Sequence, residues 1–75
     1  DKAEKSYEKG LYKEATKEFQ KIEHKTMQSQ MNLANSYYQL GSYKKAKSIY
    51  SLLKSTDAKT KKTILFKLGN CYAML

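Results

Sequence analysis

The chain has 75 residues, a net charge of +8, one cysteine, three glycines and no proline. This length allows one small domain with a thin core, and the single cysteine, Cys71, excludes an internal disulfide. Every basic residue is a lysine, which argues against specific nucleic-acid recognition because arginine supplies the bidentate contacts to phosphates and base edges. No apolar run could span a bilayer and no signal-peptide pattern is present, so the sequence predicts no compartment.

Few chain breakers and a recurring apolar stripe predict an all-α fold. We expect helices over residues 2–9, 11–24, 27–40, 43–55 and 58–75. The buried stripes of the last four helices are expected at Tyr12, Ala15, Phe19 and Ile22; Gln30, Leu33, Ala34, Tyr37 and Leu40; Tyr43, Ala46, Ile49, Tyr50 and Leu53; and Leu65, Leu68, Gly69, Tyr72 and Leu75. The chain begins without a methionine and ends inside a predicted helix, so we expect it to be a piece of a longer protein.

Short turn signals separate the predicted helices. Gly10 and Gly41 each stand between two stripes, where a left-handed C-cap is usual. The short connections predict antiparallel neighbours. Thr26 and Ser55-Thr56-Asp57 mark the other two turns, and side-chain caps at helix starts are expected at Ser42 and at Thr56 or Asp57.

The sequence repeats itself. Residues 10–19 match residues 41–50 at a spacing of 31, and residues 33–37 match residues 68–72 at a spacing of 35. Self-similarity at such a period is the signature of stacked helical repeats. We therefore divide residues 1–75 of this single domain into the end of one unit (1–26), a complete unit (27–61) and the first helix of a third (62–75).

Small residues recur inside the stripes at Ala15, Ala34, Ala46 and Gly69. A small side chain on a buried face lets two helices approach closely while a large side chain of the neighbour fills the space. Large and small residues that alternate at fixed positions therefore predict interlocking helices.

The motif resembles the tetratricopeptide repeat (TPR) family, in which small and aromatic residues precede Gly-x-Tyr-x-x-Ala-x-x-x-aromatic. The residues that carry the resemblance are Leu33, Ala34, Tyr37, Gly41, Tyr43, Ala46 and Tyr50 in the middle unit, Ala3, Gly10, Tyr12, Ala15 and Phe19 in the first, and Leu68, Gly69 and Tyr72 in the third. The resemblance implies antiparallel helix-turn-helix pairs stacked as a short right-handed superhelix, an α-solenoid. It also implies a module for protein–protein interaction, with the first helix of each unit lining a concave groove.

The sequence departs from the family pattern in places. Met27 and Ala58 stand where the family usually has proline, and Gln30 and Leu65 stand at its tryptophan-type position. The first unit is also short. Short units followed by Leu33-Ala34-Asn35-Ser36-Tyr37 are similar to the repeats of bacterial von Willebrand A-domain proteins from aerotolerance operons.

The first helices of the second and third units have another face besides the stripe, which we expect to bind a protein or peptide partner. Its residues are Gln28, Met31, Asn32, Asn35, Tyr38, Gln39, Phe66, Lys67, Asn70 and Met74. Asn35 and Asn70 are equivalent and should lie side by side, where their amides suit a peptide backbone. The alternative is that this face packs on a neighbouring helix.

Some TPR proteins hold a terminal carboxylate on this face. Asn32 and Lys67 match the positions that such proteins use, whereas Glu4 and Thr63 depart from them. The two departures argue against a carboxylate clamp.

Most of the positive charge lies in residues 27–75, which hold eight lysines against Asp57 alone. Seven of them are expected to form a basic patch: Lys44, Lys45, Lys47, Lys54, Lys59, Lys61 and Lys62. A solvated outer face is the simpler interpretation. The alternative is docking to an acidic partner or, indirectly, to an anionic membrane; non-specific nucleic-acid binding is a third class that we do not favour.

No catalytic or metal-binding pattern is present, so we expect no enzyme activity, no metal and no cofactor. His24 is the only histidine, expected in the last turn of its helix, and Cys71 is expected to be a packing residue. A competing hypothesis is a structural role in which the predicted helix 58–75 self-associates through an uncovered apolar face.

Overall fold

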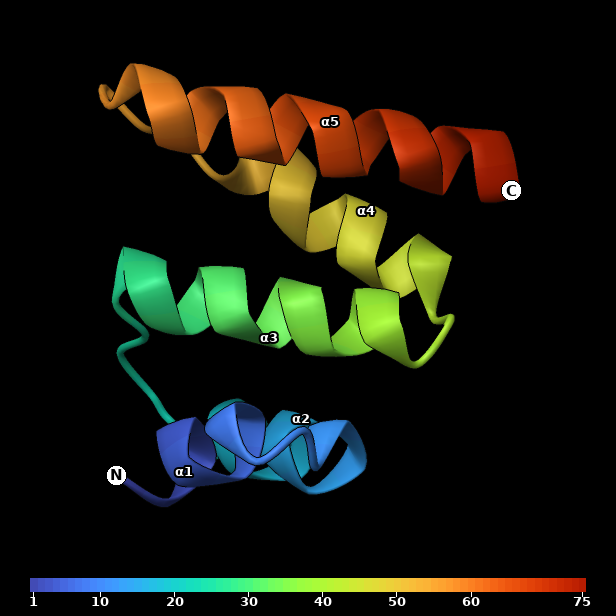
Figure 1. Cartoon of the computed structure of the whole chain (residues 1–75). Coiled ribbons are helices and arrows are strands. Elements are labelled where there is room, and N and C mark those ends of the chain that lie inside the picture. Colours follow the sequence, from blue (N-terminus) through green and yellow to red (C-terminus); the bar gives the residue numbers. More distant parts are fainter.

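The computed structural model describes residues 1–75 and contains five α-helices and no strand, which confirms the all-α prediction (Figure 1). The helices are α1 (Lys2–Glu8), α2 (Tyr12–Gln20), α3 (Met27–Gln39), α4 (Tyr43–Leu52) and α5 (Ala58–Met74).

Side chains cap three of the helices. The carboxylate of Asp1 accepts a hydrogen bond from the Glu4 amide at 2.8 Å. Thr26 Oγ1 accepts from the Ser29 amide, and Asp57 accepts from the Thr60 amide, both at 3.0 Å. The cap at Asp57 is as predicted, and the cap at Thr26 stands where the sequence predicts a turn. Ser42 precedes α4 but makes no side-chain cap bond, so that prediction was wrong.

Gly10 and Gly41 end α1 and α3 with the same geometry. Their φ angles are 78° and 79°, in the left-handed region. Gly10 N–H donates to the Tyr7 carbonyl, and the next amide, of Leu11, donates to the Ser6 carbonyl. The amides of Gly41 and of the residue after it make the same two bonds at the end of α3. This pair of bonds is the Schellman motif, and it confirms the left-handed caps.

Replacing Gly41 with alanine is expected to destabilise the protein by about 1–2 kcal/mol because an L-residue is strained at this φ. Gly10→Ala should behave alike, since the conformation is the same. Thermal unfolding followed by circular dichroism measures both effects. Unchanged midpoints would show that the two turns do not need a left-handed residue.

α2 is shorter than the sequence predicts. It ends at Gln20, where the amides of Lys21 and Ile22 bond to carbonyls three residues back. His24 therefore lies in the loop before α3, and its predicted place in a helical turn was wrong. Residues 23–26 contain no apolar side chain that could pack against α3, so nothing extends the helix beyond Ile22.

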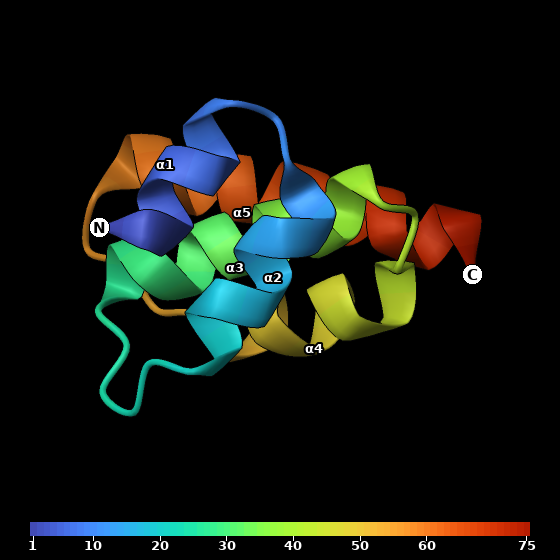
Figure 2. The same ribbon diagram turned by 90° about the horizontal axis from the view of Figure 1, so that it is seen from below.

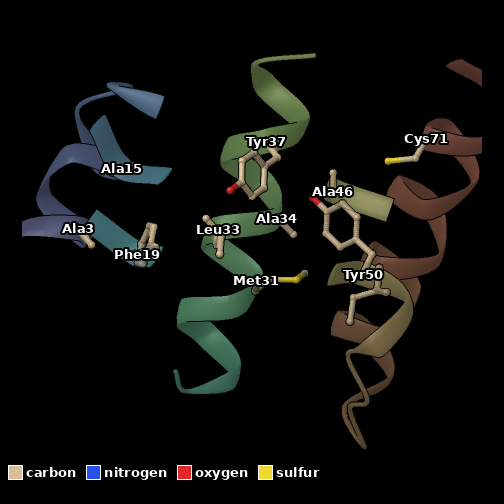
Figure 3. Packing of buried hydrophobic residues seen from close by; sticks show 11 residues of the cluster. Ala3, Ala15, Phe19, Met31, Leu33, Ala34, Tyr37, Ala46, Tyr50 and Cys71 are labelled. Carbon is tan, nitrogen blue, oxygen red and sulfur yellow. The ribbon is translucent and has the colours of Figure 1, made fainter. Parts of the chain in front are cut away.

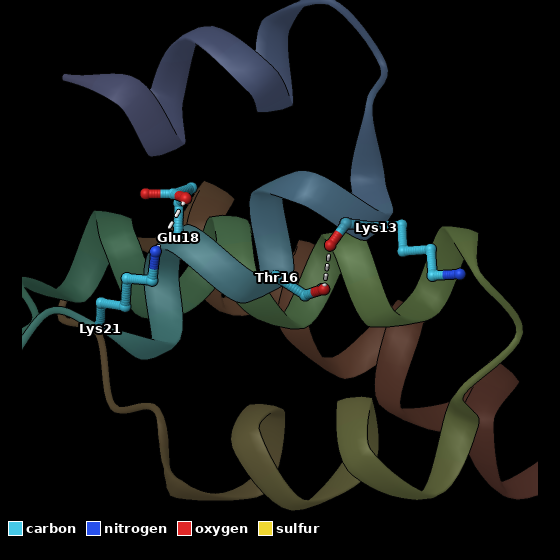
Figure 4. Close-up of polar contacts among 4 residues, drawn as sticks. All are labelled: Lys13, Thr16, Glu18 and Lys21. Carbon is cyan, nitrogen blue, oxygen red and sulfur yellow. Dashed lines mark hydrogen bonds and ion pairs between the residues drawn. The ribbon is translucent and has the colours of Figure 1, made fainter.

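The lysines and acids of α2 form few pairs. Lys21 Nζ lies 3.2 Å from Glu18 Oε1, and this is the one ion pair of the chain (Figure 4). The Thr16 hydroxyl donates to the Lys13 carbonyl at 2.7 Å in the same figure. Lysines recur every four residues from Lys9 to Lys25, but they form a solvated surface rather than a ladder of ion pairs.

Consecutive helices pack on one another along the chain. α1 contacts α2 and α3, α2 contacts α3, α3 contacts α4, and α4 contacts α5. Figure 1 shows α3, α4 and α5 running in alternating directions, which confirms the predicted antiparallel neighbours. The view from below in Figure 2 places α1 on one side of the molecule and α4 on the other, with α3 between them.

The core runs through the whole stack (Figure 3). Its buried hydrophobic residues are Ala3, Ala15, Phe19, Met31, Leu33, Ala34, Tyr37, Ala46, Tyr50, Ile64 and Cys71. Ala15, Ala34 and Ala46 are 0% exposed, which confirms that these small residues of the stripes are buried.

Gly69, the fourth small residue, is exposed, and no atom lies within 4 Å of the place where its Cβ would be. On α5 the residues turned toward the core are Ile64 and Cys71, with Leu68 partly buried. Leu65, Tyr72 and Leu75 were predicted to be buried but are each at least 60% exposed. The reason is that α5 packs mainly on α4, with polar side-chain contacts to α3, and no helix covers its other faces.

Candidate functional site

Asn35 joins four helices. Its Nδ2 donates to the Tyr7 hydroxyl of α1 at 3.1 Å. Its Oδ1 accepts from Lys67 Nζ of α5 at 2.8 Å and from the Tyr50 hydroxyl of α4. Asn35 is therefore held from three sides, and its amide fixes the spacing of α1, α3 and α5.

Asn70 makes the corresponding bond one helix further on. Its Nδ2 donates to the Tyr38 hydroxyl of α3 at 2.9 Å. Each asparagine thus donates to a tyrosine two helices earlier in the chain. Asn35 of α3 bonds Tyr7 of α1, and Asn70 of α5 bonds Tyr38 of α3. The two asparagines form no hydrogen bond with each other, and each bonds a different tyrosine.

The aromatic contacts around these tyrosines recur. Tyr7 meets the ring of Tyr12 edge-on with centroids 5.9 Å apart, and that of Phe19 at 6.4 Å. Tyr38 meets Tyr43 and Tyr50 in the same way, at 5.5 and 6.5 Å. The members of the two sets correspond one to one at the spacing that relates residues 10–19 to residues 41–50. Edge-on pairs at these distances are favourable beyond the area that they bury.

Burial sets the electrostatics of this region. It raises the pKa of the Tyr50 hydroxyl, and the nearby Cys71, Tyr7 and Tyr38 raise it further. It lowers the pKa of the Lys67 ammonium, which lies half-buried with its Nζ 5.7 Å from the centroid of the Tyr38 ring. Lys67 has no carboxylate partner, so the face carries an ordered, unpaired ammonium group.

The raised pKa of Tyr50 predicts a pH dependence of stability. As pH rises above about 10, the unfolded chain loses the phenol proton before the folded one, so the free energy of unfolding falls by up to about 1.4 kcal/mol per pH unit. Tyr50→Phe removes this dependence and, at pH 8, costs about 1 kcal/mol for the lost hydrogen bond. Urea unfolding at several pH values from about 8 to 11 should show the gap between the two proteins shrinking. A gap that stays constant with pH would contradict the assignment.

The ten residues predicted to form the binding face fall into three groups. Gln28, Gln39, Phe66 and Met74 are exposed; Asn35, Tyr38, Lys67 and Asn70 are half-buried; Met31 and Asn32 are buried. Gln28 Nε2 donates to Asn32 Oδ1 at 2.9 Å. Met31 and Asn32 are each 8% exposed, so they support the face and do not offer their side chains to a partner.

Tyr7 belongs to this face and was missed. The signal was present in the sequence, because Tyr7 precedes Tyr38 by the same spacing that separates Gly10 from Gly41. The main hollows of the surface lie elsewhere, on the α4–α5 turn and around α2 and α4. A partner would therefore meet the faces of α1, α3 and α5 as a broad surface rather than an enclosed pocket.

The seven lysines of the predicted basic patch lie in different surroundings. Lys45 Nζ lies 5.4 Å from the centroid of the Tyr37 ring on α3, and Lys47 Nζ lies 5.2 Å from that of Tyr72 on α5. Lys44 is exposed near the start of α4. The remaining four line the hollows at the α4–α5 turn: Lys54, Lys59, Lys61 and Lys62.

The structure brings together no group of three or more histidine, cysteine or acidic side chains that could hold a metal ion. Cys71 is buried, and burial raises the pKa of its thiol. None of the five helices combines the length and the apolar character that crossing a membrane requires.

Comparisons of the chain with protein-family models, with curated proteins and with solved structures find no match.

Proposed function

We propose that the chain is a helical-repeat module of the TPR type that binds a protein or peptide partner and has no catalytic role. In this proposal the helix pairs stack as a short right-handed superhelix, with units at residues 1–26, 27–61 and 62–75. The helices α1, α3 and α5 line its concave side.

The observation that carries the proposal is the recurrence of whole contacts along the stack. The Schellman turn, the two edge-on aromatic pairs and the asparagine–tyrosine bond each occur twice. Units that reproduce their contacts with the preceding unit are the basis of repeat proteins, whose extended surfaces bind partners.

The chemistry of the face suits a peptide chain. Phe66 and Met74 offer exposed apolar surface, and the Gln28 and Gln39 amides offer donors and acceptors. Lys67 uses one of its three N–H donors on Asn35, which leaves donors for a carbonyl of the partner. Asn35 itself is occupied by three neighbours and positions Lys67.

The test uses peptides selected for binding to the chain from a displayed random library that contains no Asp or Glu. Phe66→Ser is expected to weaken their affinity at least about tenfold, equivalent to about 1.4 kcal/mol. The matched control is Leu52→Ser, an equally exposed apolar residue on α4. If Leu52→Ser weakens binding while Phe66→Ser leaves it intact, the face is assigned wrongly.

Self-association through α5 is a second candidate, and a specific observation favours it. Leu65, Phe66, Tyr72 and Met74 of this helix, and Leu75 directly after it, are all at least 60% exposed. A cluster of exposed apolar side chains commonly marks an interaction site. Light scattering over a range of concentrations should show a mass that rises with concentration; a constant monomer mass would exclude this role.

A further inference from the structure

The turn between α4 and α5 forms a groove that the proposed binding face does not include. One hollow of about 370 Å³ has an apolar floor made by Leu53, Ile64, Leu65 and Leu68. A second, of about 410 Å³, adjoins it and is lined by Lys59, Lys61, Lys62, Ala58 and Leu65. Lys61 and Leu65 line both hollows, so the two are neighbours, and we call them together the α4–α5 groove.

The rim of the groove is strongly basic. Lys54 and Lys61 border the first hollow, and Lys59, Lys61 and Lys62 border the second. None of them forms an ion pair. The one acid nearby is Asp57, and its carboxylate is engaged by the Thr60 amide and hydroxyl, at 3.0 and 2.6 Å. The bond from the Thr60 hydroxyl lowers the pKa of Asp57 most, and the bond from the Thr60 amide lowers it further. Both bonds hold the carboxylate in place as the cap of α5.

The position of the lysines is unfavourable for the isolated chain. Lys59, Lys61 and Lys62 lie within the first five residues of α5, and its first turn has no acidic side chain. The helix dipole disfavours cations at this end and favours anions. Carboxylates brought by another molecule would relieve this repulsion and also pair the lysines.

The apolar residues of the groove restrict which class of anionic partner it can bind. Leu65 is 64% exposed and lines both hollows, so an occupant that covers it must bring apolar side chains as well as negative charge. A nucleic acid would bring phosphates and would leave Leu65 uncovered, and the groove has no arginine and no exposed aromatic ring on which bases could stack. A hollow with charged walls can hold the side chains on one face of a helix, and it fits a flat lipid surface less well.

We infer that the α4–α5 groove binds an acidic amphipathic helix of a partner protein, with apolar side chains over Leu65 and carboxylates on Lys54, Lys59, Lys61 and Lys62. This is a second surface, separate from the faces of α1, α3 and α5. The inference does not depend on whether those faces bind the peptides without Asp or Glu described above.

The probe is a fluorescent peptide of about four helical turns, with leucines at positions i, i+3, i+4 and i+7 and glutamates elsewhere. Fluorescence anisotropy measures its affinity for the whole chain and for two variants, Lys61→Glu and Leu65→Ser. The controls change the same residue types beside other hollows, as Lys13→Glu and Leu52→Ser. Circular dichroism checks that all four variants fold.

Lys61→Glu and Leu65→Ser are each expected to weaken binding at least about tenfold, while the controls change it less than about twofold. A scrambled peptide of the same composition should bind weakly, because its leucines no longer share a face. The inference is overturned if the peptide does not bind, or if the scrambled peptide binds equally well. It is also overturned if Leu65→Ser has no effect, or if anionic vesicles or duplex DNA bind more tightly than the peptide.

Discussion

Replacing Phe19 or Tyr50 with alanine is expected to lower the free energy of unfolding by about 3–5 kcal/mol in each case. Both side chains are at most 1% exposed, and they occupy equivalent repeat positions in matching aromatic contacts with Tyr7 and Tyr38. A chain of this length has a total stability of about 4–11 kcal/mol. Each change therefore removes a large part of it, and urea unfolding followed by circular dichroism should show early, broadened transitions.

The matched control for this pair is Tyr72→Ala. Tyr72 is also an aromatic residue of a repeated motif, but it is 60% exposed on α5. Its ring covers Lys47, a contact worth about 0.5–1 kcal/mol at an exposed site. Equal losses at Tyr72 and Tyr50 would contradict the burial on which the account rests.

Enlarging the small residues of the core should have the next largest effect. Ala15→Leu and Ala46→Leu insert three carbons where each alanine is 0% exposed, and we expect a loss of about 1–3 kcal/mol for each. Gly69 is the comparison site, because it is exposed and has open space around it. Gly69→Ala should stabilise the protein by about 1 kcal/mol through helix propensity alone, and Gly69→Leu should be tolerated.

These four variants are compared by the same urea titrations. The informative outcome is the difference in sign between the alanine positions and Gly69. A loss at Gly69→Leu as large as that at Ala46→Leu would mean that a neighbour covers α5 in solution, and would favour self-association of this helix.

The sequence allowed the helices and their turns to be predicted, because those depend on local chemistry. Apolar periodicity located the last four helices, and Gly41 and Asp57 marked turns whose geometry follows from the residue itself. The end of α2 was missed because Ile22 continues the periodic stripe, although no helical turn follows it. Helix ends depend on what the last turn can contact, and the stripe alone does not contain that information.

Burial on α5 could not be predicted from the repeat. The match equates Gly69 with Ala34, but Ala34 lies on a helix that packs on α1, α2 and α4, whereas α5 packs mainly on α4. The sequence pattern indicates which face of a helix could be buried. Whether that face is buried depends on a neighbouring helix that covers it.

The hydrogen bonds within the candidate face could not be predicted from the sequence. Asn35 was expected to hold a partner, but its amide is bonded to Tyr7, Tyr50 and Lys67, which come from three other helices. Contacts between residues that are 15 to 32 positions apart depend on how the helices stack. The surroundings of the lysines could not be predicted either. Lys45 lies over the Tyr37 ring on α3 and Lys47 over the Tyr72 ring on α5, because residues two apart point to nearly opposite sides of a helix.

The central claim is that one set of side-chain contacts is built twice along the stack. Proton nuclear Overhauser contacts between assigned aromatic rings measure it directly. We predict contacts from Tyr7 to both Tyr12 and Phe19, matching ones from Tyr38 to both Tyr43 and Tyr50, and contacts from the Asn35 side-chain amide to Tyr7. A spectrum that shows one of the two aromatic sets without the other, in a folded sample, would contradict the claim.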